Sequence, residues 1–298
     1  MGKDYSHKLG IGTVQFGLDY GVSNQQGKTP QKEAFKILEY AAEHNIQTLD
    51  TAHLYGDSET VIGENLPHGK GFEIVTKTIP IRKDCITSAD IEMVRSGIEE
   101  SIRRLKQPSL YGLMLHHADD LKAENAGFLY ALLQEYKNRN STTKIGASIY
   151  DSEQADFILD RFDIDLVQVP MNVFDQRLIE SEMLARLKQK NIEIHVRSAF
   201  LQGLIFMNPE ELPSKLSVMR SKLESLQETC KKRGVTCAEF ALAFLMQQED
   251  VDKVICGVNS LDQLKQLVES VADLPLIEQE LFPSFAIHDT SLINPANW

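Results

Sequence analysis

The sequence predicts an α/β fold, a (β/α)8 TIM barrel in a single domain, from three observations. Short apolar runs alternate with amphipathic helical stretches along almost the whole chain, as in βα units that build a parallel sheet. Eight such runs are found, the number that closes this barrel. The length of 298 residues suits one barrel, since such units routinely reach about 250 residues. We therefore expect residues 1–298 to form one domain.

The eight apolar runs are the predicted strands, and each has the length of a buried strand. In chain order they are 9–14, 47–50, 73–77, 112–116, 144–148, 166–169, 193–197 and 253–256.

The segments between the runs carry helical patterns. One apolar stripe follows Ser88, which we expect to be an N-cap, and the pairs Asp151 with Gln154 and Ser260 with Gln263 resemble capping boxes. An extra helix is predicted between the last two strands, from segments 214–233 and 238–248, and the tail from about 275 to 298 is expected over the barrel mouth. The stripes on one helix face are Ala34, Ile37, Leu38, Ala41 and Ala42, then Ile91, Val94, Ile98, Ile102 and Leu105.

Composition excludes several functions. A net charge of -12 opposes a nucleic-acid surface, which needs clustered Lys and Arg. No apolar run approaches the roughly 18 residues of a membrane span, so we expect no membrane partner. The four cysteines form no CxxC pair and the first residues lack the apolar core of a signal peptide, which favours reduced thiols in the cytoplasm.

Titratable residues follow three of the apolar runs. Asp50, Lys77 and His116 come where the second, third and fourth runs stop, and Tyr55 lies in the loop beyond the second. Because the chemistry of a (β/α)8 barrel gathers at the carboxyl ends of its strands, we expect these four side chains to converge there.

The residues around these positions resemble the aldo-keto reductase family. The likeness lies in 50–59 with Ile62 and Gly63, in 75–78 before and after Lys77, and in 113–116, and it extends to 12–14, 145–148 and 255–257. Membership implies a barrel that binds an extended nicotinamide cofactor and reduces a carbonyl group reversibly. The chain contains no G-x-G-x-x-G between a strand and a helix, so a doubly wound nucleotide fold has no support.

The resemblance implies catalytic roles for Asp50, Tyr55, Lys77 and His116. Tyr55 is the expected general acid, but a phenol with a pKa of about 10 is a weak acid at neutral pH. We expect Lys77 to lower the pKa of Tyr55, Asp50 to hold Lys77 charged, and His116 to orient the carbonyl oxygen. The substrate is expected near Tyr55, His116 and His117, and near a further histidine, His53.

The resemblance also implies cofactor contacts. Ser148 and Gln168 match residues that hold the nicotinamide carboxamide, although Ile149 replaces an Asn, and Arg197 stands where an aromatic ring often stacks on the nicotinamide. The remaining expected contacts are Gly12, Thr13, Val14, Asp50, Ser198, Phe200, Leu201, Gly203, Gly257, Val258, Asn259, Ser260 and Gln263.

The family most often uses NADP(H), which the resemblance favours over NAD(H). Around the adenosine phosphate, however, this chain has Val258, Asn259 and Gln263 where Arg or Lys is usual, and only Lys265 could substitute. Without a guanidinium the 2′-phosphate is discriminated less well, so NAD(H) stays open.

Other interpretations are open or weak. His117 follows His116, but adjacent strand residues point to opposite faces, and no metal site is expected. Gly27, Lys28 and Thr29 imitate a P-loop with the wrong spacing, and we expect a loop over the barrel mouth. A cofactor-binding regulatory subunit with little turnover and a sugar-phosphate isomerase remain alternatives to a reductase of a small carbonyl compound; the oligomeric state is not predicted.

Overall fold

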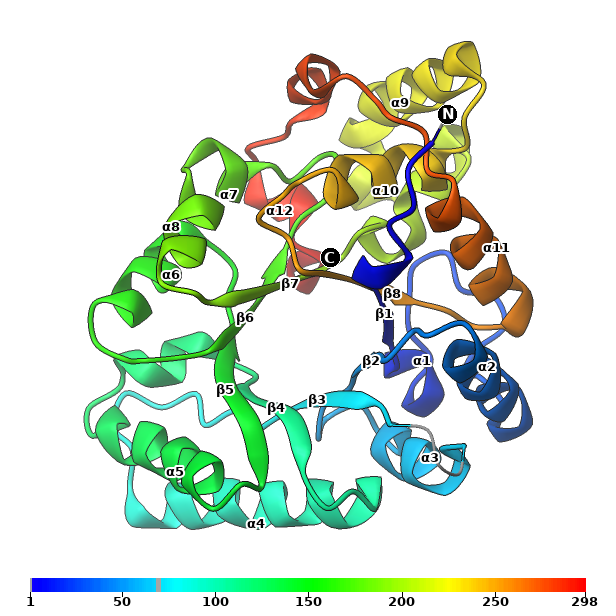
Figure 1. Ribbon diagram of the computed structural model, residues 1–298. Helices are drawn as coiled ribbons and strands as arrows, with labels where there is room; N and C mark the ends of the chain where they lie inside the picture. Colours follow the sequence, from blue (N-terminus) through cyan, green and yellow to red (C-terminus); the bar gives the residue numbers. More distant parts are fainter. Residues whose placement is uncertain (1, 68–70) are drawn as a thin grey trace.

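Eight parallel strands form a closed barrel, each hydrogen-bonded to its neighbours in sequence order, β1 being paired with β8. This holds in the computed structural model, which describes residues 2–67 and 71–298. The helices surround the strands (Figure 1). The predicted (β/α)8 fold is therefore confirmed.

The strand bounds agree with the apolar runs to within two residues at most ends. The strands are β1 Leu9–Gly12, β2 Thr48–Asp50, β3 Glu73–Lys77, β4 Leu110–Leu115, β5 Thr142–Ser148, β6 Leu166–Pro170, β7 Glu193–Arg197 and β8 Lys253–Gly257. The α-helices are α1 Val14–Gly17, α2 Gln31–Glu43, α3 Ser58–Asn65, α4 Ser88–Leu105, α5 Ala126–Asn138, α6 Ser152–Leu159, α7 Arg177–Glu180, α8 Met183–Gln189, α9 Arg220–Arg233, α10 Cys237–Met246, α11 Leu261–Ala272 and α12 Thr290–Ile293. Short 3-10 helices are Ser6–Lys8, Ala118–Lys122, Leu201–Phe206, Pro209–Glu211, Ser214–Met219, Gln279–Phe285 and Pro295–Asn297.

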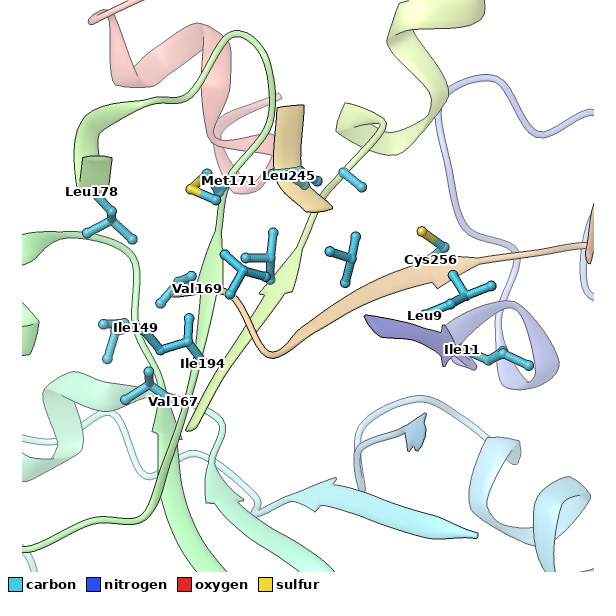
Figure 2. Close-up of a cluster of buried hydrophobic side chains, with 14 of the residues drawn as sticks. Leu9, Ile11, Ile149, Val167, Val169, Met171, Leu178, Ile194, Leu245 and Cys256 are labelled. Atoms are coloured by element: carbon cyan, nitrogen blue, oxygen red, sulfur yellow. The ribbon is translucent and has the colours of Figure 1, made fainter. Parts of the chain in front are cut away.

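Alternate residues of each strand face opposite sides of the barrel wall. The outward side chains join the main hydrophobic core between strands and helices. Figure 2 shows part of this layer, in which Val167, Val169 and Ile194 of β6 and β7 gather with Leu178 of α7 and Leu245 of α10.

The inward positions carry both apolar and polar side chains. A small apolar cluster of Val75, Met114 and Leu166 occupies the interior, while the side chain of Lys77 lies two residues beyond Val75 on the same face. On β7 the inward His195 is fully buried and its Nε2 lies 2.6 Å from Oε1 of Glu193. The interior thus holds charged groups along its length.

The structure shows which residue caps the N-terminus of each of three helices. Helix α4 is capped by Thr87 and not by Ser88 as predicted, because Thr87 and Asp90 exchange hydrogen bonds in a capping box. Asp151 caps α6 and Ser260 caps α11, as expected.

The extra helix and the tail are both present. Between β7 and β8 the chain forms α9 and α10, which confirms the added helix. In the tail, Phe282 packs edge-on against Phe240 and Phe244 of α10, and the backbone N–H of Ile287 donates to the carbonyl of Phe174, beyond the carboxyl end of β6. No helix of the described residues is long and apolar enough to cross a membrane.

Candidate active site

A buried ion pair lies at the carboxyl ends of β2 and β3. The ammonium of Lys77 is 2.7 Å from both carboxylate oxygens of Asp50 and also donates to the carbonyl of Thr51 at 2.9 Å. Lys77 is only 1% exposed and Asp50 4%. Burial lowers the pKa of Lys77, and the Asp50 carboxylate acts in the opposite direction. The register of β2 and β3 positions the pair. Asp50 is the partner of Val75, and Lys77 lies two residues beyond Val75 on β3.

Tyr55 and His116 complete the group. The Lys77 ammonium is 5.2 Å from the centre of the Tyr55 ring, and the Tyr55 and His116 rings meet edge to face with centroids 5.7 Å apart. His116 directly follows β4. The structure therefore brings the four predicted catalytic residues together.

Two glycines and a hydroxyl network fix the loop that carries Tyr55. A Cβ on Gly17, in α1, would lie 1.7 Å from the carbonyl oxygen of Tyr55, so the two backbones are in direct contact. Gly56 has φ +58° and packs on Gly17 in return, a conformation that glycine adopts at little cost. The Ser58 hydroxyl donates to Thr13 at 2.8 Å. Close backbone packing thus positions the phenol.

The pKa of Tyr55 is raised rather than lowered. Burial is the largest cause and the Asp50 carboxylate adds to it, while the cation that opposes them is Arg197. The expected net lowering of the pKa of Tyr55 is therefore wrong, because burial outweighs the nearby positive charge. The phenol stays protonated at neutral pH, which keeps its proton available for transfer.

His116 is neutral over the physiological range. Burial lowers the pKa of His116 to about 3, helped by the positive charges of Lys77 and Arg197, then of Arg82 and His117. A neutral imidazole can still donate one N–H hydrogen bond. It suits orienting an oxygen better than supplying a proton.

Gln168 connects this group to the next strands. Its amide donates to Asp50 Oδ1 at 2.7 Å, and its register partner on β5 is Ser148. Ile149 points away into the core, fully buried. Several buried polar atoms near the carboxyl ends have no hydrogen-bond partner among the described residues, namely Gln15 Oε1, Thr78 Oγ1, His116 Nδ1, Gln168 Oε1, Asn172 Nδ2, Arg197 Nη2 and Asn259 Oδ1.

These atoms test whether a nicotinamide cofactor fits. Buried polar groups normally find partners, and Gln168 Oε1 could accept from a carboxamide N–H₂ while Arg197 and Asn172 could donate to oxygens. The residues present therefore fit the group.

Arg197 and the loop after β7 adjoin this region. The guanidinium of Arg197 stacks 4.4 Å above the ring centre of Tyr150, and its Nη1 lies 3.5 Å from the Ser198 hydroxyl. Left-handed backbone follows at Leu201, Gln202 and Gly203, with φ 47°, 55° and 88°. Such strain in residues other than glycine clusters at functional sites.

The expected cofactor contacts at the ends of β1 and β8 differ in whether a side chain or only the backbone is accessible to a cofactor. Gly12 and Gly257 are paired across these strands, and a Cβ on Gly257 would lie 2.4 Å from the side-chain amide of Gln15. Thr13 donates to the Asp50 carbonyl at 2.8 Å. The side chains of Val258 and Leu201 are buried in the core, so only their backbones could meet a cofactor. The other expected contacts lie close by in sequence: Val14 starts α1, Phe200 follows β7, and Asn259, Ser260 and Gln263 surround the start of α11.

The segment 18–30 runs between three of these loops. Lys28 pairs with Asp57 at 2.9 Å, Tyr20 accepts from Gln202 at 3.0 Å, and the Thr29 hydroxyl donates to the carbonyl of Asn259 at 3.4 Å. It therefore contacts the loops after β2, β7 and β8.

Two predicted substrate residues have side-chain partners within the protein. His53 Nδ1 lies 3.2 Å from the hydroxyl of Ser101 on α4, and His117 Nδ1 lies 3.2 Å from Asp120. The sequence analysis did not single out Tyr150, which lies two residues beyond the end of β5 and stacks with Arg197, although the rule of carboxyl strand ends could have found it. No cluster of His, Cys, Asp or Glu side chains in the described ranges could hold a metal ion.

Comparison with known proteins identifies the class. Residues 8–282 match the model of the Aldo/keto reductase family, and the chain belongs to that family. It is an NAD(P)-dependent oxidoreductase.

The relatives are distant. L-galactose dehydrogenase of Arabidopsis thaliana is 25% identical, with 89% of this chain and 84% of that protein covered. NADH-specific methylglyoxal reductase of Escherichia coli is 23% identical, with 89% of each chain covered. The holo form of an aldo-keto reductase from Bacillus halodurans has the same fold, with a TM-score of 0.77, 21% identity and 98% and 95% coverage.

Proposed function

We propose that this chain interconverts an aldehyde or ketone and the alcohol, with Tyr55 as the general acid in the direction of reduction. The observation that carries the proposal is the contact of Tyr55 with both Lys77 and His116 at the carboxyl end of the barrel. When bound, the nicotinamide supplies or accepts the hydride.

The side chains of the site have separate roles in protonating the carbonyl oxygen. As the carbonyl oxygen gains negative charge, Tyr55 donates its proton, and an alkoxide is a much stronger base than the phenolate that remains. The Lys77 ammonium, held by Asp50, stabilises that phenolate. The neutral imidazole of His116 donates a hydrogen bond that orients the oxygen.

For the cofactor, Gln168 and Ser148 would hold the carboxamide and Arg197 would lie beside the nicotinamide ring. The strained loop of 198–203 would meet the pyrophosphate, and the start of α11 would meet the adenosine end of the cofactor, since such barrels commonly bind the cofactor after strands 7 and 8. We also place the tail of 275–298 at the rim of the mouth, supported by its contact with Phe174.

The substrate class we propose is a small polar carbonyl compound. The free N–H groups of Arg197 Nη2 and Asn172 Nδ2 suit acceptor oxygens beside the reacting carbon. Methylglyoxal, after the Escherichia coli relative, and L-galactose with oxidised cofactor, after the Arabidopsis relative, belong in a first panel, with benzaldehyde as an apolar contrast.

The test is cofactor titration by fluorescence followed by the carbonyl panel, for the wild type and Tyr55→Phe. We expect unchanged cofactor binding and a loss of kcat of about 10²- to 10⁴-fold, the range of general acid catalysis. Tyr130→Phe on the outer helix α5 is the matched control.

The outcomes separate the alternatives. Full activity in Tyr55→Phe would refute its role as the acid. Cofactor binding with no turnover of any carbonyl compound would favour a regulatory subunit, and no cofactor binding at all would refute the proposed function.

A further inference from the structure

A carboxylate from α2 lies on the N-terminus of α11. Oε1 of Glu33 accepts a hydrogen bond from the backbone N–H of Leu261, the first residue of α11, at 2.9 Å. The two residues are 228 positions apart in the sequence, so the contact is purely tertiary. This N–H, followed by the neighbouring Lys36, lowers the pKa of Glu33, which is therefore negatively charged at neutral pH.

Two further backbone donors at this helix start are satisfied by the chain itself. The N–H of Gln263 donates to the Ser260 hydroxyl at 3.3 Å, and the N–H of Asn259 donates to Oε1 of Gln263 at 2.7 Å. A helix N-terminus binds phosphate through free N–H groups and its positive dipole. Here a phosphate would have to displace the oxygens that occupy the N–H groups of Asn259, Leu261 and Gln263, and the oxygen on Leu261 is charged.

The cations near this helix start do not offset its negative charge. The ammonium of Lys265 lies 5.9 Å from the ring centre of Tyr40 on α2, and Lys36 is paired with Glu33 at 3.1 Å. Asp262 adds a second negative charge in the first turn of α11. A dianionic group would therefore meet the carboxylates of Glu33 and Asp262, and the nearby Lys36 is already paired with Glu33.

We propose that Glu33 makes this site selective for NAD(H), by accepting a hydrogen bond from the ribose 2′-hydroxyl and repelling the 2′-phosphate of NADP(H). The proposal rests on the proposed function, since it assumes that the adenosine end of the cofactor reaches the start of α11. An acidic side chain reads the ribose hydroxyl in NAD sites of a different fold. Repulsion of the competing ligand is a common source of specificity. The NADP(H) preference implied by family resemblance is then reversed by residues of this chain.

The experiment measures binding without catalysis. The full-length wild type is titrated by calorimetry with ADP-ribose and with its 2′-phosphorylated form, which lack the nicotinamide, and then with NADH and NADPH. We expect the 2′-phosphorylated ligands to bind at least tenfold more weakly. Glu33→Gln, which keeps an oxygen for the Leu261 N–H, is expected to lower this ratio about tenfold, and Glu39→Gln on the exposed side of α2 to leave it unchanged.

The results distinguish this inference from the proposed function. Equal or tighter binding of the 2′-phosphorylated ligands by the wild type would overturn the proposed selectivity. The same holds if the ratio of the two affinities, phosphorylated against unphosphorylated, is equal in Glu33→Gln and Glu39→Gln. In either case, carbonyl reduction with either cofactor would leave the proposed function standing. Failure of all four ligands to bind would refute both. An increased preference for the unphosphorylated ligands in Lys36→Gln would support the role of the Glu33 charge.

Discussion

At the scale of single residues, Asp50 and Lys77 show how the barrel keeps a charge in its interior. An unpaired buried charge is costly, but here Lys77 has the carboxylate and a backbone carbonyl as acceptors, and Asp50 has Lys77 and Gln168 as donors. The pair consequently has few ways to rearrange. In the proposed reaction, the pair would fix the place at which negative charge develops on Tyr55.

His116 makes stability depend on pH. In the unfolded chain a histidine binds a proton below a pKa of about 6.5, whereas folded His116 has a pKa of about 3. Between these values the unfolded state binds more protons, so the free energy of unfolding falls as the pH falls. We expect His116→Gln to lose part of this slope between about pH 6.5 and pH 3, measured by urea unfolding. Exposed His44→Gln is the control, and an unchanged slope in His116→Gln would contradict the depressed pKa.

At the scale of elements, α1 and the loop after β2 behave as one unit. The Cβ of Gly17→Ala would overlap the Tyr55 carbonyl and lie 2.6 Å from the Ser58 N–H. Overpacking typically costs about 1–3 kcal/mol, and we expect a lower melting temperature together with a fall in kcat because Tyr55 is displaced. The melting temperature and steady-state kinetics measure the two effects.

A matched glycine provides the control for that prediction. A Cβ on Gly127, in the first turn of α5, would meet nothing within 4 Å, so Gly127→Ala is expected to be neutral or stabilising by up to about 1 kcal/mol. If Gly17→Ala behaved like Gly127→Ala, the close contact between the two backbones would be refuted.

At the scale of the whole molecule, the tail is part of the core. Phe282 is 1% exposed and contacts Phe240 and Phe244, so Phe282→Ala should lower the free energy of unfolding by about 3–5 kcal/mol. Leu276→Ala in the same tail, at a side chain that is 59% exposed, should change it by less than about 0.5 kcal/mol. Urea unfolding checks both, and similar small losses would mean that the tail is only loosely attached.

The sequence was sufficient for the barrel and for much of the site's position. Strand ends alone located Asp50, Lys77 and His116, because a parallel barrel places all carboxyl ends on one side. The sequence was less informative where two neighbouring hydroxyl residues could both cap a helix, as Thr87 and Ser88 could at the start of α4. Thr87 is the cap because Asp90 completes a capping box with it. Contacts between distant segments, such as Glu33 with Leu261 and Gly17 with Tyr55, follow no periodicity and required the folded chain. The side-chain partners of His53 and His117 could not be predicted for the same reason.

The backbone contact of Gly17 with Tyr55 limits how this barrel can be re-engineered. Loops at the carboxyl end of such barrels are commonly treated as interchangeable parts on a constant scaffold. Here the segment with Tyr55 is shaped by α1, some forty residues earlier in the chain, and by the glycine at position 56. A graft of the Tyr55 loop into another barrel would therefore have to bring residues 13–17 with it, and recombination between positions 17 and 55 of two parent sequences should succeed only when both parents share this glycine pair.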